Sequence, residues 1–177
     1  MMILGIDPGK RNFGVSIVGL SSTGNTYKVF SGFMLNHAIT DFKNSELAIE
    51  QAKAFKREIN GYLKEYKVDL IVVERFMVRG RYNGATSEYI SAMIGVLLVS
   101  GVKVCIVTPP EWKNAFNKKF DLKGMYLKLK PLPPHIVDAT LIGIYGAAKV
   151  SKLEKFKCVN SEVHLVDRIR KCHVAHT

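Results

Sequence analysis

The hydrophobic positions of this chain form short runs near the N-terminus and two-faced helical stretches further on. Residues 3–7, 13–18 and 27–35 are largely apolar, and Pro-Gly or polar clusters separate them. Short apolar runs bounded by turn residues predict strands, here three strands joined as an antiparallel meander. In residues 44–66 the apolar side chains recur at helical spacing, which predicts an amphipathic helix.

The chain then alternates strands with helices. In the run 69–74 every residue between Asp69 and Glu74 is apolar and most are β-branched, which is typical of a strand buried on both faces. The pattern further predicts a helix over 85–99, a strand over 102–107, a helix that Thr108 caps, and a helix over 135–148. This order predicts an α/β fold: a mixed five-stranded sheet, made of the antiparallel three-strand meander plus parallel strands, flanked by helices.

The length of the chain suits one domain. Its 177 residues, 47% of them hydrophobic, are enough for one core. We expect residues 1–150 to form that domain and residues 151–177 to be a basic C-terminal tail, either part of the domain or partly mobile. The first residues carry no basic stretch of the secretory-signal type. The apolar run 90–99 is far shorter than the ~20 residues that cross a bilayer.

The charge of the chain points to a polyanionic partner. Lys and Arg number 26 against 15 Asp and Glu, a formal net charge of +11. Such a surplus favours nucleic acid over an anionic membrane, because no basic amphipathic helix or lipidation motif accompanies it. A basic protein without such a partner is the alternative reading.

The cysteines give no disulfide framework. Cys105, Cys158 and Cys172 are odd in number and far apart, so we expect the reducing cytoplasm as the location. Cys105 lies in an apolar strand pattern and is expected to be a buried core thiol. The two tail cysteines, with the histidines around them, match no common zinc spacing.

Four side chains stand where predicted elements begin or end. Asp7 ends the first strand, Glu74 ends the strand 69–74, and His135 and Asp138 share one face of the last helix. Two strand-end carboxylates side by side repel each other unless cations neutralise them, and Mg²⁺ or Mn²⁺ accepts such oxygen ligands. Two ions ~3.5–4 Å apart hydrolyse phosphodiesters by activating water and stabilising the leaving oxygen.

Each residue also has an ordinary explanation. Asp7 before Pro-Gly can initiate a turn, and Glu74 can pair with Arg75 at a strand end. Asp138 can be an acid favoured by the helix dipole, and His135 can be structural. Only the combination of these four residues in this order indicates a catalytic metal site.

Three segments of the chain resemble motifs of one known family. Leu4–Gly9 with Gly14 downstream, Val72–Glu74 followed by Phe76 and Met77, and His135–Ala139 resemble the motifs of the RuvC family of Holliday junction resolvases. The resemblance covers residues 2 to about 149 and implies a ribonuclease H-like fold, a homodimer and cleavage of branched DNA by two metal ions. A chain this small and rich in lysine resembles the phage-encoded members, whose location would be the host cytoplasm.

The resemblance also implies roles for individual residues. It implies that Asp7, Glu74, His135 and Asp138 bind two Mg²⁺ or Mn²⁺ ions. Phe76 matches the aromatic residue that enters the junction centre, although it follows the Glu by two residues where the family has three. The helix 85–99 would form the dimer interface, with small residues Ala85, Ser91, Ala92 and Gly95. The family's basic loop is matched by Lys113, Lys118, Lys119 and Lys123.

Further DNA contacts are expected beside the two strand-end carboxylates. Arg75, Arg79, Arg81 and Tyr82 follow Glu74, and Lys10 and Arg11 follow Asp7. Basic side chains there would meet phosphates, and Tyr82 would stack on an unpaired base. A solvated basic loop is the alternative.

Other functions fit the sequence less well. An actin-like nucleotide-binding domain needs a second Gly-rich phosphate loop and a longer chain. A YqgF-type nuclease or RNA-processing factor shares the Asp-x-Gly opening and stays the main alternative. A non-catalytic DNA-binding relative would not need Asp7, Glu74 and Asp138.

Overall fold

The computed structural model of the chain describes residues 1–9, 13–20, 27–35, 45–76, 84–119 and 132–150. The expected tail, 151–177, lies outside these residues, so the proposed boundary at 150 stays a prediction. None of the helices within the described ranges is long and apolar enough to span a membrane.

The strands form one mixed sheet of five. Their order across the sheet is β3-β2-β1-β4-β5. β1 pairs antiparallel with β2, and β2 with β3, whereas β1 pairs parallel with β4, and β4 with β5. The meander and the parallel strands are therefore confirmed. The bounds are β1 Met2–Asp7, β2 Phe13–Leu20, β3 Tyr27–Leu35, β4 Leu70–Glu74 and β5 Lys103–Val107.

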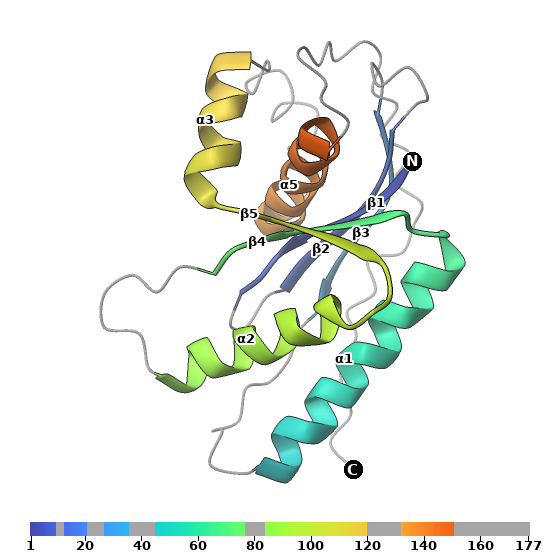
Figure 1. Cartoon of the computed structure of the whole chain (residues 1–177), viewed down its shortest axis with the longest axis vertical. Helices are drawn as coiled ribbons and strands as arrows, with labels where there is room; N and C mark the ends of the chain where they lie inside the picture. The colour runs from blue at the N-terminus through green and yellow to red at the C-terminus, as the bar shows by residue number, and fades with distance from the viewer. Residues whose placement is uncertain (10–12, 21–26, 36–44, 77–83, 120–131, 151–177) are drawn as a thin grey trace.

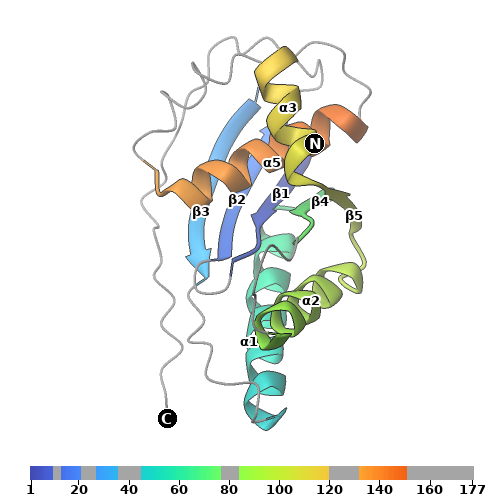
Figure 2. The same cartoon turned by 90° about the vertical axis from the view of Figure 1, so that its left-hand side faces the viewer.

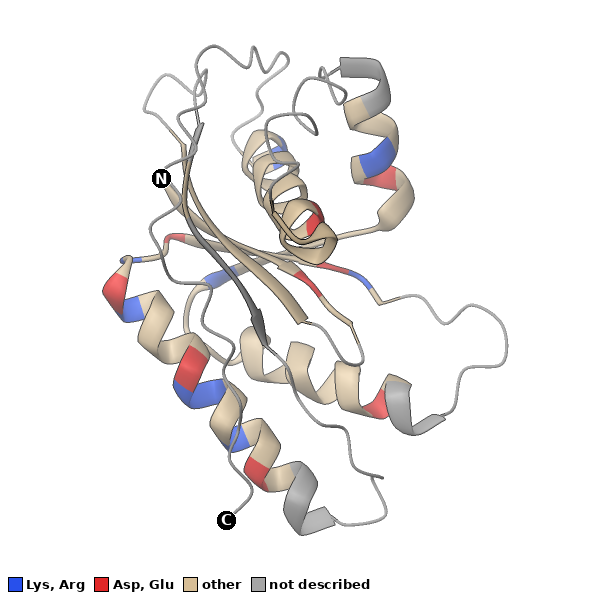
Figure 3. Ribbon diagram, turned by 180° about the vertical axis from the view of Figure 1, so that it is seen from behind, with Lys and Arg blue, Asp and Glu red and all other residues tan. Residues whose placement is uncertain are grey.

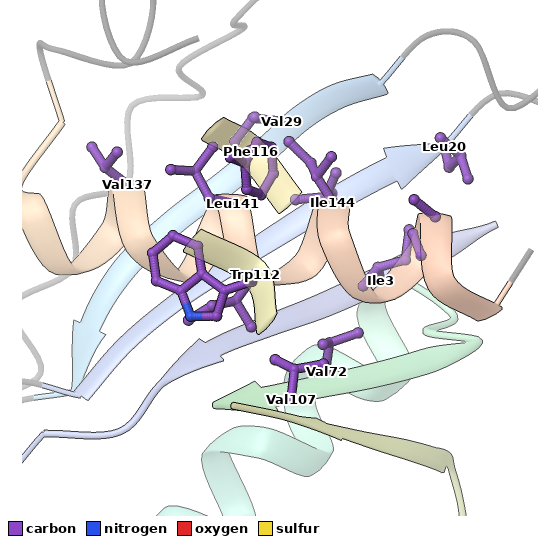
Figure 4. Close-up of a cluster of buried hydrophobic side chains, with 14 of the residues drawn as sticks. Ile3, Leu20, Val29, Val72, Val107, Trp112, Phe116, Val137, Leu141 and Ile144 are labelled. Carbon is purple, nitrogen blue, oxygen red and sulfur yellow. The ribbon is translucent and has the colours of Figure 1, made fainter. Parts of the chain in front are cut away.

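Helices cover both faces of the sheet (Figures 1 and 2). α1 (Ser45–Glu65) and α2 (Gly84–Leu98) lie on one face, and α3 (Pro109–Lys119) and α5 (Pro134–Val150) lie on the other. Each face has its own apolar cluster: Phe55 and Ile59 of α1 pack on the first, and Trp112 and Phe116 of α3 on the second. Figure 4 shows the second cluster, in which Trp112 lies beside Val107 and Val72.

The neighbouring strands β4 and β5 differ in burial. Leu70 to Val73 of β4 are buried, as expected for a central strand. β5 is an edge strand, so Lys103 is exposed and 44% of Ile106 is accessible. The expectation that Cys105 is a buried core thiol is wrong: the side chain is only partly buried, because β5 is an edge strand of the sheet that the described residues form.

α5 packs unusually close to β1 and β2 through glycines. A Cβ atom at Gly5 would lie 2.1 Å from the carbonyl oxygen of Ala139, and one at Gly14 would lie 2.2 Å from that of His135. Only residues without a side chain permit this approach. The first turns of α5 therefore come down onto the end of β1 that carries Asp7.

Candidate active site

Asp7 and Glu74 end two neighbouring parallel strands in register. Ile6 pairs with Val73, so Asp7 and Glu74 are the next residues on β1 and β4. The Asp7 side chain is only 14% exposed, and Glu74 is half-buried. The predicted pair of strand-end carboxylates therefore lies at one edge of the sheet.

The first turns of α5 add the other two predicted residues. His135 Nδ1 lies 2.8 Å from Asp7 Oδ2, although the two are 128 residues apart in the chain. Asp138 follows almost one helical turn later and raises the pKa of both Asp7 and Glu74 through charge repulsion. The four residues that the sequence singled out are thus brought to the same corner of the fold.

Burial and mutual repulsion make both strand-end carboxylates hard to ionise. Burial is the main cause that raises the pKa of Asp7 above 3.8, while His135 and Lys113 act against it. Burial likewise raises the pKa of Glu74, with smaller contributions from the charges of Asp7 and Asp138. Such an arrangement is unfavourable on its own and favours a cation nearby.

The donor set suits a hard divalent cation. Three carboxylates and one imidazole are ligand types that Mg²⁺ or Mn²⁺ accepts. Within the ranges described above, no three His, Cys, Asp or Glu side chains already converge as metal ligands. In the same structure, Asp7 is hydrogen-bonded to His135, and Glu74 to Trp112.

Trp112 is a member of this corner that sequence reasoning did not single out. Its indole Nε1–H donates a hydrogen bond to Glu74 Oε2 at 2.5 Å. The available signal was weak: it is the only tryptophan of the chain, in the first turn of a helix that directly follows the strand next to β4.

The predicted DNA-binding residues are only partly described. Arg75 is exposed, and its backbone N–H donates to the Val107 carbonyl. Lys113 is exposed, with Nζ 4.9 Å from the centre of the Trp112 ring. Phe76 is partly buried and packs against the apolar cluster to which α1 and α2 contribute. Outside the described residues or side chains lie Lys10, Arg11, Arg79, Arg81, Tyr82, Lys118, Lys119 and Lys123.

Comparison with known proteins identifies the family. The model of the family described as "Protein of unknown function (DUF3010)" matches residues 1–132, three quarters of the chain. The chain belongs to this family.

Its relatives agree with the resemblance that the motifs indicated. The crossover junction endodeoxyribonuclease RuvC of Corynebacterium glutamicum is 27% identical over 96% of this chain and 80% of its own length. That of Corynebacterium diphtheriae is 28% identical over 80% of this chain and 90% of its own length. The resemblance to RuvC is therefore confirmed along nearly the whole of the chain.

Solved structures confirm the fold. RuvC of T. thermophilus in complex with a Holliday junction superimposes with a TM-score of 0.70 at 20% identity, covering 87% of this chain and 98% of that one. The yeast mitochondrial Holliday junction resolvase gives 0.58 at 13% identity, over 86% of this chain and 81% of that one. The fold predicted from the sequence, ribonuclease H-like with a mixed sheet, is thus confirmed.

Proposed function

We propose that this protein is a divalent-metal-dependent endonuclease that hydrolyses phosphodiester bonds in branched DNA, with four-way junctions as its substrate. The observation that carries the proposal is the corner of the fold where Asp7 and Glu74 end adjacent strands and α5 brings in His135 and Asp138. The relatives named for junction cleavage support the choice of substrate.

The roles proposed for the residues follow from their positions. Asp7, Glu74, Asp138 and His135 would hold two Mg²⁺ or Mn²⁺ ions. Bound there, the ions would activate a water and stabilise the leaving oxygen. Asp7 and Glu74 supply oxygen atoms from a rigid sheet, which fixes where the scissile phosphate must lie.

The basic residues at the same edge are proposed to bind the DNA arms. Arg75 and Lys113 are exposed beside Glu74 and Trp112, where their charges can meet phosphates flanking the cut. We propose that the active form is a homodimer, because two symmetric cuts in a four-way junction require two active sites related by a two-fold axis. The proposed location is the cytoplasm.

A cleavage assay tests the proposal. The purified protein is offered four-way junctions, three-way junctions, linear duplex and RNA–DNA hybrid, each with Mg²⁺ or with Mn²⁺. We expect paired nicks in the junction arms and little cleavage of linear duplex of the same sequence. Chelation of the metal should stop the reaction without releasing the junction. Processing of RNA with no cleavage of branched DNA would instead favour the YqgF-type alternative.

A further inference from the structure

The two strand-end carboxylates of the candidate site are held by different helices. Asp7 contacts His135 of α5, whereas Glu74 accepts its hydrogen bond from Trp112 of α3. The proposed function uses His135 as a ligand and assigns nothing to Trp112. An indole can only donate, so Trp112 is not itself a metal ligand.

The indole of Trp112 is buried in the core. Its surface is 1% exposed, and its ring meets Phe116 edge-on with centroids 6.3 Å apart. Figure 4 shows the ring between α5 and the strands, beside Val107. A buried indole N–H needs an acceptor, and here that acceptor is a side chain at the end of β4.

The start of α3 holds this ring in place. The Thr108 backbone N–H and hydroxyl both donate to Glu111 Oε2, at 2.6 and 2.8 Å, as in a capping box. Glu111 Oε1 in turn accepts a hydrogen bond from Lys149 of α5 at 3.0 Å. Trp112 is the next residue after Glu111, so its direction is set by a turn anchored to a second helix.

Glu74 needs such a partner more than Asp7 does. A glutamate side chain has one more rotatable bond than an aspartate, and the neighbouring Asp7 repels it. One Oε atom bound to a rigid donor restricts the orientations that the carboxylate can adopt. A carboxylate has further lone pairs, so this bond does not exclude a cation from Glu74.

We propose that Trp112 is a positioning residue, whose indole N–H fixes the Glu74 carboxylate in the orientation that binds the divalent cation. This inference rests on the proposed function for the identity of the cation. It goes beyond that function because it assigns a role in metal affinity to a buried residue that is not itself a metal ligand. Loss of a hydrogen bond to a metal ligand typically weakens metal affinity or activity about 10- to 100-fold.

The chain offers a direct spectroscopic probe, since Trp112 is its only tryptophan. The ¹⁵N–¹H spectrum therefore contains one indole resonance, and it reports on the bond to Glu74. We expect Mg²⁺ to shift this resonance during titration. Glu74→Gln should shift the indole resonance in metal-free buffer, whereas Glu65→Gln, at an exposed site, should not. An indole resonance that neither Glu74→Gln nor Mg²⁺ moves would overturn the proposal.

Two variants remove the N–H and keep the ring. Trp112→Phe is the simple one, and biosynthetic replacement of Trp112 by 3-benzothienylalanine preserves the shape with sulfur in place of N–H. We expect both to weaken Mn²⁺ binding, measured by calorimetry and electron paramagnetic resonance, by about 10-fold or more. Cleavage at saturating junction should need correspondingly more Mn²⁺, and junction affinity in Ca²⁺ should stay within about twofold of wild type.

Phe116→Leu is the matched control, because it removes buried ring packing beside Trp112 and keeps the N–H. It should lower the thermal midpoint and leave Mn²⁺ affinity near that of the wild type. If Trp112 has only a structural role, Mn²⁺ affinity should either fall with the thermal midpoint in all three variants or stay unchanged in all three. Wild-type protein that binds Mn²⁺ but cuts no branched DNA would defeat only the proposed function. Junction cleavage with unchanged Mn²⁺ affinity in both N–H-free variants would defeat only the positioning role.

Discussion

At the scale of single residues, the most specific expectation concerns the pKa of Asp7 and its effect on stability. Burial raises its pKa, so ionisation is harder in the folded chain than in the unfolded one. Its contribution to stability is therefore fully present below its ordinary pKa of 3.8 and is lost as the pH rises through the folded-state value. Once it is ionised, this carboxylate opposes folding unless a cation accompanies it.

Asp7→Asn should abolish junction cleavage and still raise the thermal midpoint in chelator at neutral pH, because the buried charge is gone. Added Mg²⁺ should stabilise the wild type more than the variant. Calorimetry with and without Mg²⁺, together with cleavage and junction-binding assays, measures these effects. Glu65→Gln, at an exposed site in α1, serves as the control. Cleavage within tenfold of wild type would remove Asp7 from the proposed metal site.

His135 can be tested through the choice of metal. Its Nδ1 faces Asp7, and 43% of its side chain is exposed. If the imidazole binds metal it favours Mn²⁺ over Mg²⁺, since nitrogen is a softer ligand than carboxylate oxygen. We expect His135→Asp to shift the preference toward Mg²⁺. The measurement is the ratio of cleavage rates in the two metals. If the rate falls equally in both, His135 acts on Asp7 or moves a proton without binding metal.

At the scale of elements, the site depends on how closely α5 approaches the sheet. Gly14 lies opposite Asp7 in the β1–β2 pairing, and a methyl group there would meet the carbonyl oxygen of His135. Neither partner is a flexible side chain, so α5 itself has to move. Gly14 of the first motif therefore lets α5 reach the corner of the fold where Asp7 of the same motif lies.

Gly14→Ala should lower the free energy of unfolding by about 1–3 kcal/mol, the usual cost of overpacking, and should reduce cleavage. Gly61→Ala is the matched control, since Gly61 lies in α1 with nothing within 4 Å of the added methyl group. That change should stabilise the protein by up to about 1 kcal/mol. Chemical denaturation of both variants gives the comparison. A Gly14→Ala protein as stable and active as wild type would show that α5 does not approach so closely.

The capping of α3 predicts a different pH dependence. The Thr108 backbone N–H, then Lys149 and the Thr108 hydroxyl, hold the pKa of Glu111 at about 2. Its contribution is therefore present above the ordinary pKa of 4.5 and is lost as the pH falls toward 2.

Glu111→Gln should lower the free energy of unfolding near neutral pH by about 1 kcal/mol. The difference from wild type should vanish as the pH falls from about 4.5 toward 2. Denaturant titrations at several pH values measure it. Lys149→Met is the control, because it removes the contact with α5 and keeps the Thr108 bonds. A difference that does not depend on pH would contradict the assigned role of Glu111.

At the scale of the whole molecule, α2 is the proposed dimer face. Figure 3 shows mixed charges along α1, whereas the coloured part of α2 is nearly free of charge. Ser91 and Ala92 are exposed, nothing lies within 4 Å of a methyl group at Gly95, and 53% of Leu98 is accessible. An uncharged stripe with small residues permits close approach of a second copy.

Ala92→Arg should convert a dimer into a monomer, because it places a charge in the middle of this stripe. Asn60→Arg adds the same charge on an exposed part of α1 and should leave the dimer intact. Sedimentation velocity measures both, with and without a four-way junction. A wild-type protein that stays monomeric under both conditions would refute the dimer. Paired cleavage by a monomeric Ala92→Arg protein would show that cleavage does not require the dimer.

The sequence by itself determined the order of the elements and the candidate acids. Strand and helix periodicities are local properties, so the meander, the central strand ending at Glu74 and the last helix were predicted with bounds within a few residues. Asp7 and Glu74 stood out because a charged residue at the end of an apolar strand is visible without knowledge of the fold.

Only the tertiary structure decided how these residues are held. The bond from Trp112 to Glu74 spans 38 residues and that from His135 to Asp7 spans 128, so no local pattern contains them. The same holds for the partly buried Cys105, whose strand has an apolar sequence but lies at the sheet edge. Burial and contact depend on which segments pack together, and that packing is a property of the whole fold.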